Sequence, residues 1–195
     1  MPILAETQLE ADFEKLRRHI SHPQALNPAH SDPIFYFVYP PGQILTVRRL
    51  MPGWIARLKN ENGLTVETLS LSEVIWSIIE ASNRWADWLE IEPEYDQKEV
   101  NEAMRSVLRQ NNALIEHVAA QVITPRENTV LFIIDIELLH PYVRSRTIEN
   151  YLNNKVKIPT IFFYPGRRAG QYGLHFLEFY SEDSGYRSTL IGGLD

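Results

Sequence analysis

Residues 129–136 read TVLFIIDI, and this stretch decides the fold class of the chain. Its apolar run from 130 to 134 is short and rich in β-branched and aromatic side chains, and an acidic residue follows at once. Such a run is typical of a strand that is buried on both faces of a sheet. Because strands of this kind belong mostly to parallel sheets covered by helices, we predict a strand over Val130–Ile136 in an α/β protein.

Segments on either side of this strand have the same character. Residues 34–39 read IFYFVY and precede a Pro-Pro-Gly turn, and residues 158–164 read IPTIFFY and precede a Pro-Gly turn. Each is short, apolar and bounded by turn residues, so each is predicted to be a buried strand that ends at its turn. Weaker strand patterns cover 64–69, 174–180 and 187–191.

Helical patterns fill the intervals between these strands. The predicted helices cover 9–20, 44–60, a segment from Ser70 or Ser72 to Ile79, 100–121 and 145–153. Pro52 lies inside the second of them and predicts that this helix either restarts or kinks there. The alternation of buried strands with helices predicts three layers, with helices on both faces of a mostly parallel sheet.

The composition is that of one globular domain. The chain has 195 residues, of which 44% are hydrophobic and 23% are charged, and it has no cysteine. We predict a single domain over 1–195, with an N-terminal helix and loop at 1–30 and a core at 34–190. The missing cysteines exclude disulfides and thiolate chemistry, and no apolar run is long enough to span a bilayer, so we expect a cytoplasmic protein.

The net charge of −6 is unevenly distributed along the chain. Residues 1–140 carry 12 basic and 20 acidic side chains, whereas residues 141–195 carry 7 basic and 5 acidic ones. Tight independent binding to a nucleic-acid backbone requires a basic face, which this balance disfavours. We therefore predict that DNA is contacted only indirectly, through a complex.

The loop after the strand at 34–39 is where a doubly wound sheet would hold phosphates. It reads YPPGQILTVRRL, with one glycine, no lysine, and two prolines that have no N–H to donate. A phosphate loop of the Walker A type needs glycines and a lysine at fixed spacing. The layout therefore resembles a degenerate P-loop NTPase-like core without a Walker A motif. A regulator that binds a nucleotide without hydrolysing it stays open as an alternative.

The end of the strand at 130–136 offers a second candidate site. Asp135 stands where a Walker B aspartate would, but the acidic neighbour, Glu137, is two positions on rather than adjacent. Together with His140, these carboxylates suggest a metal-dependent nuclease as a weaker alternative. A strand-end aspartate more often caps a turn or pairs with a nearby loop. We predict no catalytic residue, no bound metal and no cofactor.

Two pairs of residues are candidate partner contacts. Trp85 and Trp88 are three positions apart, so on a helix they share one face, and they adjoin an acidic segment. Tryptophan is enriched at protein interfaces, although ordinary core packing is an alternative for both. Arg167 and Arg168 follow a strand-ending Pro-Gly and are predicted to form a basic tip that holds an anion or an acidic partner.

Several short motifs follow one another along the chain, at Val47–Leu50 with Arg48 and Arg49, Leu139–Arg144, Pro159–Gly166 with Tyr164 and Pro165, Gly170, Leu174–Leu177, Tyr186 and Arg187. Together they resemble the motifs of the BrxB family of BREX (bacteriophage exclusion) systems. These motifs occur in order over most of residues 34–190, whereas 81–125 show nothing specific.

The resemblance implies a role in anti-phage defence. Other BREX components include a methyltransferase, an ATPase and a PglZ-type protein that is alkaline-phosphatase-like. The family has no established catalytic activity to carry onto these residues. The resemblance therefore implies a non-enzymatic adaptor or scaffold that acts by protein–protein interaction, with the PglZ-type protein as the expected partner. A homodimer is left open, and no membrane contact is expected.

Overall fold

The computed structural model describes residues 2–21, 33–91 and 94–193. The sequence predicts a proline-containing loop over 22–33, and residues 22–32 of it lie outside the described residues. The elements in chain order are α1 (Pro2–Ile20), β1 (Ile34–Tyr39), η1 (Pro41–Gln43), α2 (Ile44–Asn62), β2 (Thr65–Ser70), α3 (Leu71–Ala81), α4 (Trp85–Ile91), α5 (Gln97–Arg109), η3 (Gln110–Asn112), α6 (Ala113–Val122), β3 (Thr129–Ile134), η4 (Ile136–Leu139), α7 (Ser145–Leu152), β4 (Thr160–Ala169), β5 (Gly173–Phe176), β6 (Asp183–Ser184) and β7 (Thr189–Gly192).

The sheet is mostly parallel, as the buried strand patterns predicted. Its strand order is β2-β3-β4-β1-β7, and each neighbouring pair on this path is parallel. β5 and β6 extend the sheet from β4 as antiparallel strands. β1 therefore lies between β4 and β7, and strands from both halves of the chain form one sheet. The predicted α/β class is confirmed.

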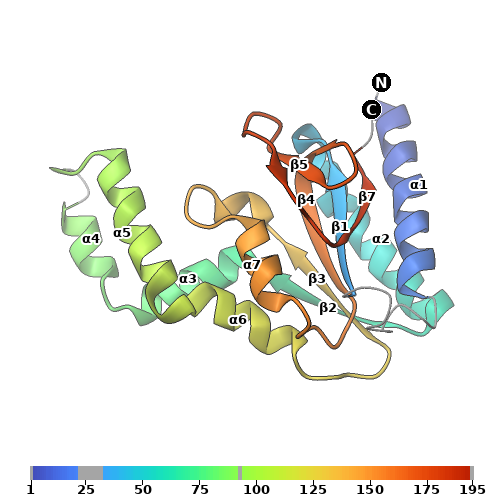
Figure 1. The fold of residues 1–195 in the computed structure, drawn as a ribbon, viewed down its shortest axis with the longest axis horizontal. Helices are drawn as coiled ribbons and strands as arrows, with labels where there is room; N and C mark the ends of the chain where they lie inside the picture. Colours follow the sequence, from blue (N-terminus) through green and yellow to red (C-terminus); the bar gives the residue numbers. More distant parts are fainter. Residues whose placement is uncertain (1, 22–32, 92–93, 194–195) are drawn as a thin grey trace.

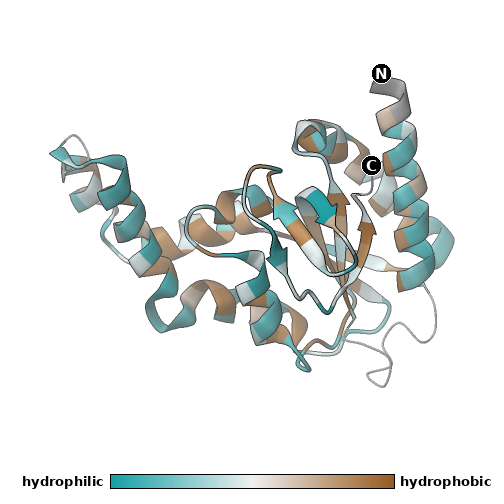
Figure 2. Cartoon of the chain, turned by 45° about the horizontal axis from the view of Figure 1, so that its top comes forward, coloured by the Kyte–Doolittle hydropathy of each residue, from teal (hydrophilic) through white to brown (hydrophobic). Residues whose placement is uncertain are grey.

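Helices cover both faces of the sheet (Figure 1). Along β1, Phe35, Phe37 and Tyr39 face a core shared with α1 and α2, whereas Tyr36 and Val38 face a core shared with α3, α6 and α7. Both sets are buried because successive strand residues point to opposite faces. Apolar residues concentrate in the strands and in the helices that face them, while the outer sides of α1 and α5 are hydrophilic (Figure 2).

Local signals explain where several helices begin and end. The Ser70 hydroxyl caps α3 by accepting from the Glu73 N–H at 3.3 Å, which is one of the two predicted caps. α2 ends at Gly63, whose φ of +65° closes the helix in the left-handed region. α2 is continuous through Pro52, so the helix does not restart there.

Several predicted boundaries are wrong. The strand predicted over Val130–Ile136 ends at Ile134, because Asp135 takes a positive φ. The helix predicted over 100–121 is two helices, because Asn111 and Asn112 adopt positive φ and break it. The strand predicted to stop at Pro165 continues to Ala169, because β4 changes partner there and pairs with β5. The strand predicted over 174–180 ends at Phe176, because Leu177 and the residue after it take positive φ.

α4 and α5 form an arm that projects away from the sheet (Figure 1). α5 begins with a capping box, in which Asp96 accepts from the Glu99 N–H at 2.8 Å and Glu99 accepts from the Asp96 N–H at 3.0 Å. The base of the arm packs on α3 and α6. Across the described part of the chain, no helix is both long and apolar enough to cross a membrane.

Candidate functional site

The loop between β1 and α2 has few backbone donors to offer a phosphate. Pro40 and Pro41 have no N–H, and the N–H of Gln43 already donates to the Pro40 carbonyl at 2.8 Å. A phosphate loop works by directing several unused amides at one point. The geometry of this turn is therefore that of a connection into α2.

Arg48 occupies the space where this loop meets the end of β3. Its Nη2 lies 2.7 Å from Asp135 Oδ1 and 2.9 Å from Glu137 Oε1. The other Asp135 oxygen accepts from the Ser70 hydroxyl at 2.5 Å. The carboxyl ends of β2 and β3 are thereby joined to α2 through one largely but not fully buried aspartate. The prediction that a strand-end aspartate would pair with a neighbouring segment is confirmed in this geometry.

Asp135, Glu137 and His140 do not converge on one point. The chain leaves β3 at Asp135, where φ is +61°, so Asp135 and Glu137 are not on one face of a strand. His140 is turned to Tyr180, whose hydroxyl contacts its Nε2. In residues 2–21, 33–91 and 94–193, no three His, Cys, Asp or Glu side chains gather as metal ligands would.

Replacing Arg48 with alanine is expected to lower the free energy of unfolding by about 1 kcal/mol, because two mostly buried carboxylates then lose their shared counter-charge. Arg49→Ala is the matched control, since among the described residues Arg49 forms one ion pair, with the partly exposed Glu6 at 2.7 Å. It should cost less than about 0.5 kcal/mol. Urea denaturation of both variants measures the difference, and equal costs would contradict a structural role for the Arg48 pairs.

The two predicted partner tryptophans lie on the arm, where they differ in burial. Trp85 is 39% exposed and meets Trp76 of α3 edge to face, with ring centroids 5.1 Å apart. Trp88 is half-buried and packs against the main core. Part of the Trp88 side chain therefore packs against the core, which was the alternative to partner binding. Trp85 remains at the surface. Their binding role stays a prediction.

A groove of about 170 Å³ runs between α3, α4 and α5. We call it the arm groove; it is lined by Trp76, Trp85, Trp88, Leu89, Tyr95, Glu99, Val100, Ala103 and Met104. Leu89 and Tyr95 are about half exposed, at 51% and 48%. Sequence reasoning missed them, although Leu89 follows Trp85 by four positions and so shares its helix face.

The arm that carries this groove is acidic. Asp87, Glu90, Glu94 and Asp96 are all exposed on α4 or between α4 and α5. The whole segment 87–102 has seven acidic residues and one lysine. The arm therefore joins an exposed aromatic surface to a strongly negative one.

The C-terminal motif is mainly structural. Tyr36, Tyr164 and Tyr186 pack together in the core, with the rings of Tyr36 and Tyr186 centred 5.0 Å apart. Burial raises the pKa of Tyr186 to about 12, so its hydroxyl stays protonated. Pro159 is buried, and its carbonyl accepts from the Leu131 N–H at 2.9 Å.

Two glycines of the motif are required by the backbone. A Cβ on Gly166 would lie 2.2 Å from the carbonyl oxygen of His175, because β4 and β5 approach closely there. Gly170 has a φ of +64°, which favours glycine at the turn into β5. The geometry of the β4–β5 hairpin therefore accounts for the two glycines of the motif.

Arg167 and Arg168 do not form the tip of a turn, so that prediction is wrong. Both belong to β4, where they pair with His175 and Leu174 of β5, because the strand continues past Pro165-Gly166. Arg167 is exposed, whereas Arg168 is partly buried and donates to the Leu190 carbonyl at 3.5 Å. The turn itself begins at Gly170.

Comparison with known proteins gives the same family as the motifs. A family model described as BREX protein BrxB matches residues 67–191, more than half of the chain. A BREX protein BrxB from Bacillus cereus (strain H3081.97) is 28% identical over 160 residues, which cover 80% of this chain and 82% of that protein. No solved structure matches the chain. Arg48 and Arg49 lie before the residues that the family model matches. The chain belongs to the BrxB family and is a component of an anti-phage BREX system.

Proposed function

We propose that this protein is a non-enzymatic adaptor of the BREX system and that the arm groove holds its partner. The observation that carries the proposal is the exposed aromatic surface of the groove. Trp76, Trp85 and Leu89 are each between 39% and 51% exposed and lie side by side. Large apolar side chains gathered at the surface cost free energy unless a partner covers them, and such clusters mark binding sites.

The position and the charge of the arm indicate which kind of partner would fit the groove. The arm stands away from the sheet, so a bound protein would reach the groove without meeting the rest of the chain (Figure 1). The exposed acidic residues of the arm favour a basic partner, which they would also steer during encounter. An amphipathic helix with apolar anchors and flanking lysines or arginines has this chemistry. We expect it to belong to the PglZ-type protein.

The proposal includes the absence of catalysis. The residues at the carboxyl edge of the sheet support this part of it. If the fold is a degenerate P-loop NTPase-like core, the loop before α2 and the end of β3 are where a nucleotide and its metal would bind. There Arg48 pairs with Asp135 and Glu137, and two prolines stand in the loop. A nucleotide-binding regulator or a nuclease at this edge would first have to break those pairs. Isothermal titration with ATP and GTP at millimolar concentration is expected to detect no site at this loop and the end of β3, and any binding should belong to the separate pocket described below, where Arg144→Gln weakens it.

The adaptor proposal is tested by co-purification of the tagged full-length protein with a co-expressed PglZ-type protein. The double variant Trp85→Ala/Leu89→Ala is expected to weaken binding about tenfold or more, because it removes two central apolar anchors. Thermal unfolding of the variant should change little, since both side chains are substantially exposed. Binding should also weaken as salt rises, because the acidic residues of the arm contribute by long-range attraction.

The matched control is Tyr172→Ala/Phe179→Ala, which removes two side chains that are 55% and 73% exposed near β5. This variant should bind the partner as the unaltered protein does. The adaptor proposal fails if the partner is not retained even at low salt. The assignment to the arm groove fails if the groove variant binds normally or if both double variants lose binding equally.

A further inference from the structure

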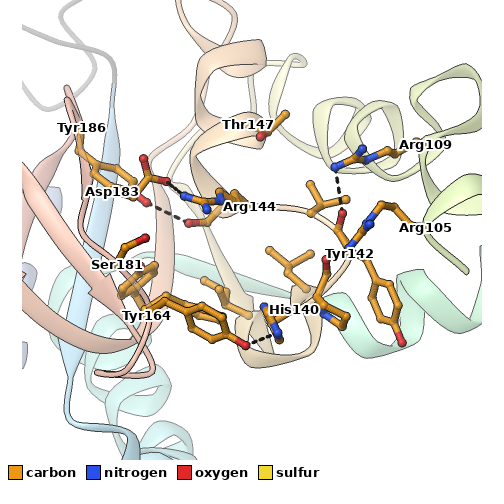
Figure 3. Close-up of a pocket in the computed structure, with 17 residues that line it drawn as sticks. Arg105, Arg109, His140, Tyr142, Arg144, Thr147, Tyr164, Ser181, Asp183 and Tyr186 are labelled. Atoms are coloured by element: carbon orange, nitrogen blue, oxygen red, sulfur yellow. Dashed lines mark hydrogen bonds and ion pairs between the residues drawn. The ribbon is translucent and has the colours of Figure 1, made fainter. Parts of the chain in front are cut away.

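A second cavity, of about 350 Å³, lies beyond the carboxyl ends of β3 and β4. Its walls come from α5, from the segment between η4 and α7, and from the segment between β5 and β7 (Figure 3). Ligands of open α/β sheets collect at this edge. Pockets that hold small molecules have volumes from about 300 Å³ upward, so this one is large enough for a ligand.

The cavity is basic although the chain is acidic. Its charged lining consists of Arg105, Arg109 and Arg144 with one carboxylate, that of Asp183. Asp183 is already neutralised by Arg146, whose Nη1 lies 2.9 Å from its Oδ1. The three lining arginines therefore exceed the negative charge available to them inside the cavity.

These arginines have donors to spare. The Arg144 side chain is 68% exposed, and among the described residues its one ion pair is the long one to Asp183, at 3.8 Å. Arg109 donates only weakly to the Tyr142 carbonyl, at 3.3 Å, and is exposed. Arg105 and Arg109 extend from α5 on one side, and Arg144 lies across the cavity from them (Figure 3). A guanidinium has five N–H donors, so at Arg144 and Arg109 most of these donors have no acceptor within the described part of the chain.

Arg105 anchors the cavity wall and still has an unused donor. Its Nη2 donates to the Pro141 carbonyl at 2.9 Å, and its Nη1 contacts Glu102. Its Nε is buried and has no hydrogen-bond partner among the described residues.

His140 responds to this positive charge. The pKa of its imidazole is lowered by burial and then by Arg105 and Arg144, which both disfavour a further positive charge. Two arginines from different elements thus act on the same point of the cavity floor. An anion placed between them would oppose that effect.

We propose that this cavity binds the phosphate group of a small phosphorylated molecule, of about the size of a mononucleotide. Arg105, Arg109 and Arg144 would hold the phosphate, because guanidinium groups match its geometry with paired, charge-assisted hydrogen bonds. Tyr142 and Tyr180 line the same cavity and provide aromatic surface for the rest of the ligand. The site is separate from the arm groove and from the Arg48 pairs, so it does not depend on the adaptor role.

Isothermal titration of the full-length protein tests the site with four probes: inorganic phosphate, ribose 5-phosphate, AMP and ATP. All are expected to bind at one site with dissociation constants in the millimolar range or below. Equal affinities would assign recognition to the phosphate alone, while tighter binding of AMP than of ribose 5-phosphate would add contacts to the base. The proposal is overturned if none of the probes binds at millimolar concentration.

Arg144→Gln and Arg109→Gln should each weaken binding about tenfold, because each removes charge-assisted bonds to the phosphate. Both side chains are substantially exposed, so the variants are expected to fold. Arg49→Gln, on α2, is the matched control for the loss of one arginine and should bind normally. Equal weakening by all three variants would mean non-specific attraction and would overturn the site.

A proton NMR titration gives a readout that a merely structural change would not reproduce. Phosphate should raise the pKa of the His140 imidazole, because the anion offsets Arg105 and Arg144. The hydroxyl of Tyr180 is the other group in contact with this ring. In Arg144→Gln the pKa of His140 should start higher and move less. A His140 resonance that does not respond to phosphate would contradict the placement of the ligand.

Discussion

Replacing Trp54 with alanine is expected to lower the free energy of unfolding by about 3–5 kcal/mol, the usual cost of emptying a large aromatic site. Trp54 of α2 is fully buried. It stacks on Phe13 of α1 with ring centroids 4.7 Å apart, and its edge meets Phe37 of β1 at 5.3 Å. One side chain thus joins two helices to the sheet.

Urea denaturation followed by circular dichroism measures this cost. Trp54→Phe is the matched control: it keeps an aromatic ring but loses the bond from the indole Nε1 to Glu10, which is 2.9 Å long. It should cost about 1–2 kcal/mol. If Trp54→Ala is no more destabilising than Trp85→Ala on the exposed arm, then α1 and α2 are not held as the structure describes.

Urea denaturation of Trp54→Ala also tests how many units of the chain unfold cooperatively. The family model matches residues 67–191, which do not include α1, β1 or α2. Yet β1 pairs with β4 on one side and with β7 on the other, so the matched residues cannot complete their sheet without it. We predict that Trp54→Ala shifts one transition for the whole chain, in line with the single domain expected from its length.

The strands that sequence patterns predicted best are those buried on both faces. β1, β3 and the first part of β4 are continuous apolar runs, because side chains on either face enter a core. β6 has two residues and β7 has four, and short segments at a sheet margin leave little periodicity to detect. The break at Asn111 and Asn112 was invisible for another reason, since asparagine is tolerated both in a helix and in the left-handed region.

The candidate sites were harder to predict, because they depend on strand order. Arg48 and Asp135 are 87 positions apart and meet only because β1, β4 and β3 are adjacent in the sheet. The arginines of the cavity that we propose binds phosphate likewise come from two separate segments of the chain. Trp85 was accessible to sequence reasoning because its neighbours on the arm are local, within one or two helical turns.

Replacing Glu149 with alanine is the second change with a large expected effect, a loss of about 3 kcal/mol in the free energy of unfolding. Glu149 of α7 is buried, and its Oε1 accepts from the Arg187 N–H at 3.1 Å, the Ser188 N–H at 3.2 Å and the Ser188 hydroxyl at 2.6 Å. Alanine would leave these donors without their acceptor, just before β7 begins. The Tyr186-Arg187 motif is thus fixed through its backbone.

Glu149→Gln is the matched control, because its amide oxygen can still accept while the charge is lost. It should cost about 1 kcal/mol, since hydrogen bonds to a neutral acceptor are weaker than those to a carboxylate. Urea denaturation gives both values, and hydrogen exchange at β7 shows whether that strand opens first in Glu149→Ala. Equal stability of the alanine and glutamine variants would mean that α7 does not hold the approach to β7. A large loss in alanine alone would show that one buried carboxylate ties the family motif to the edge of the sheet.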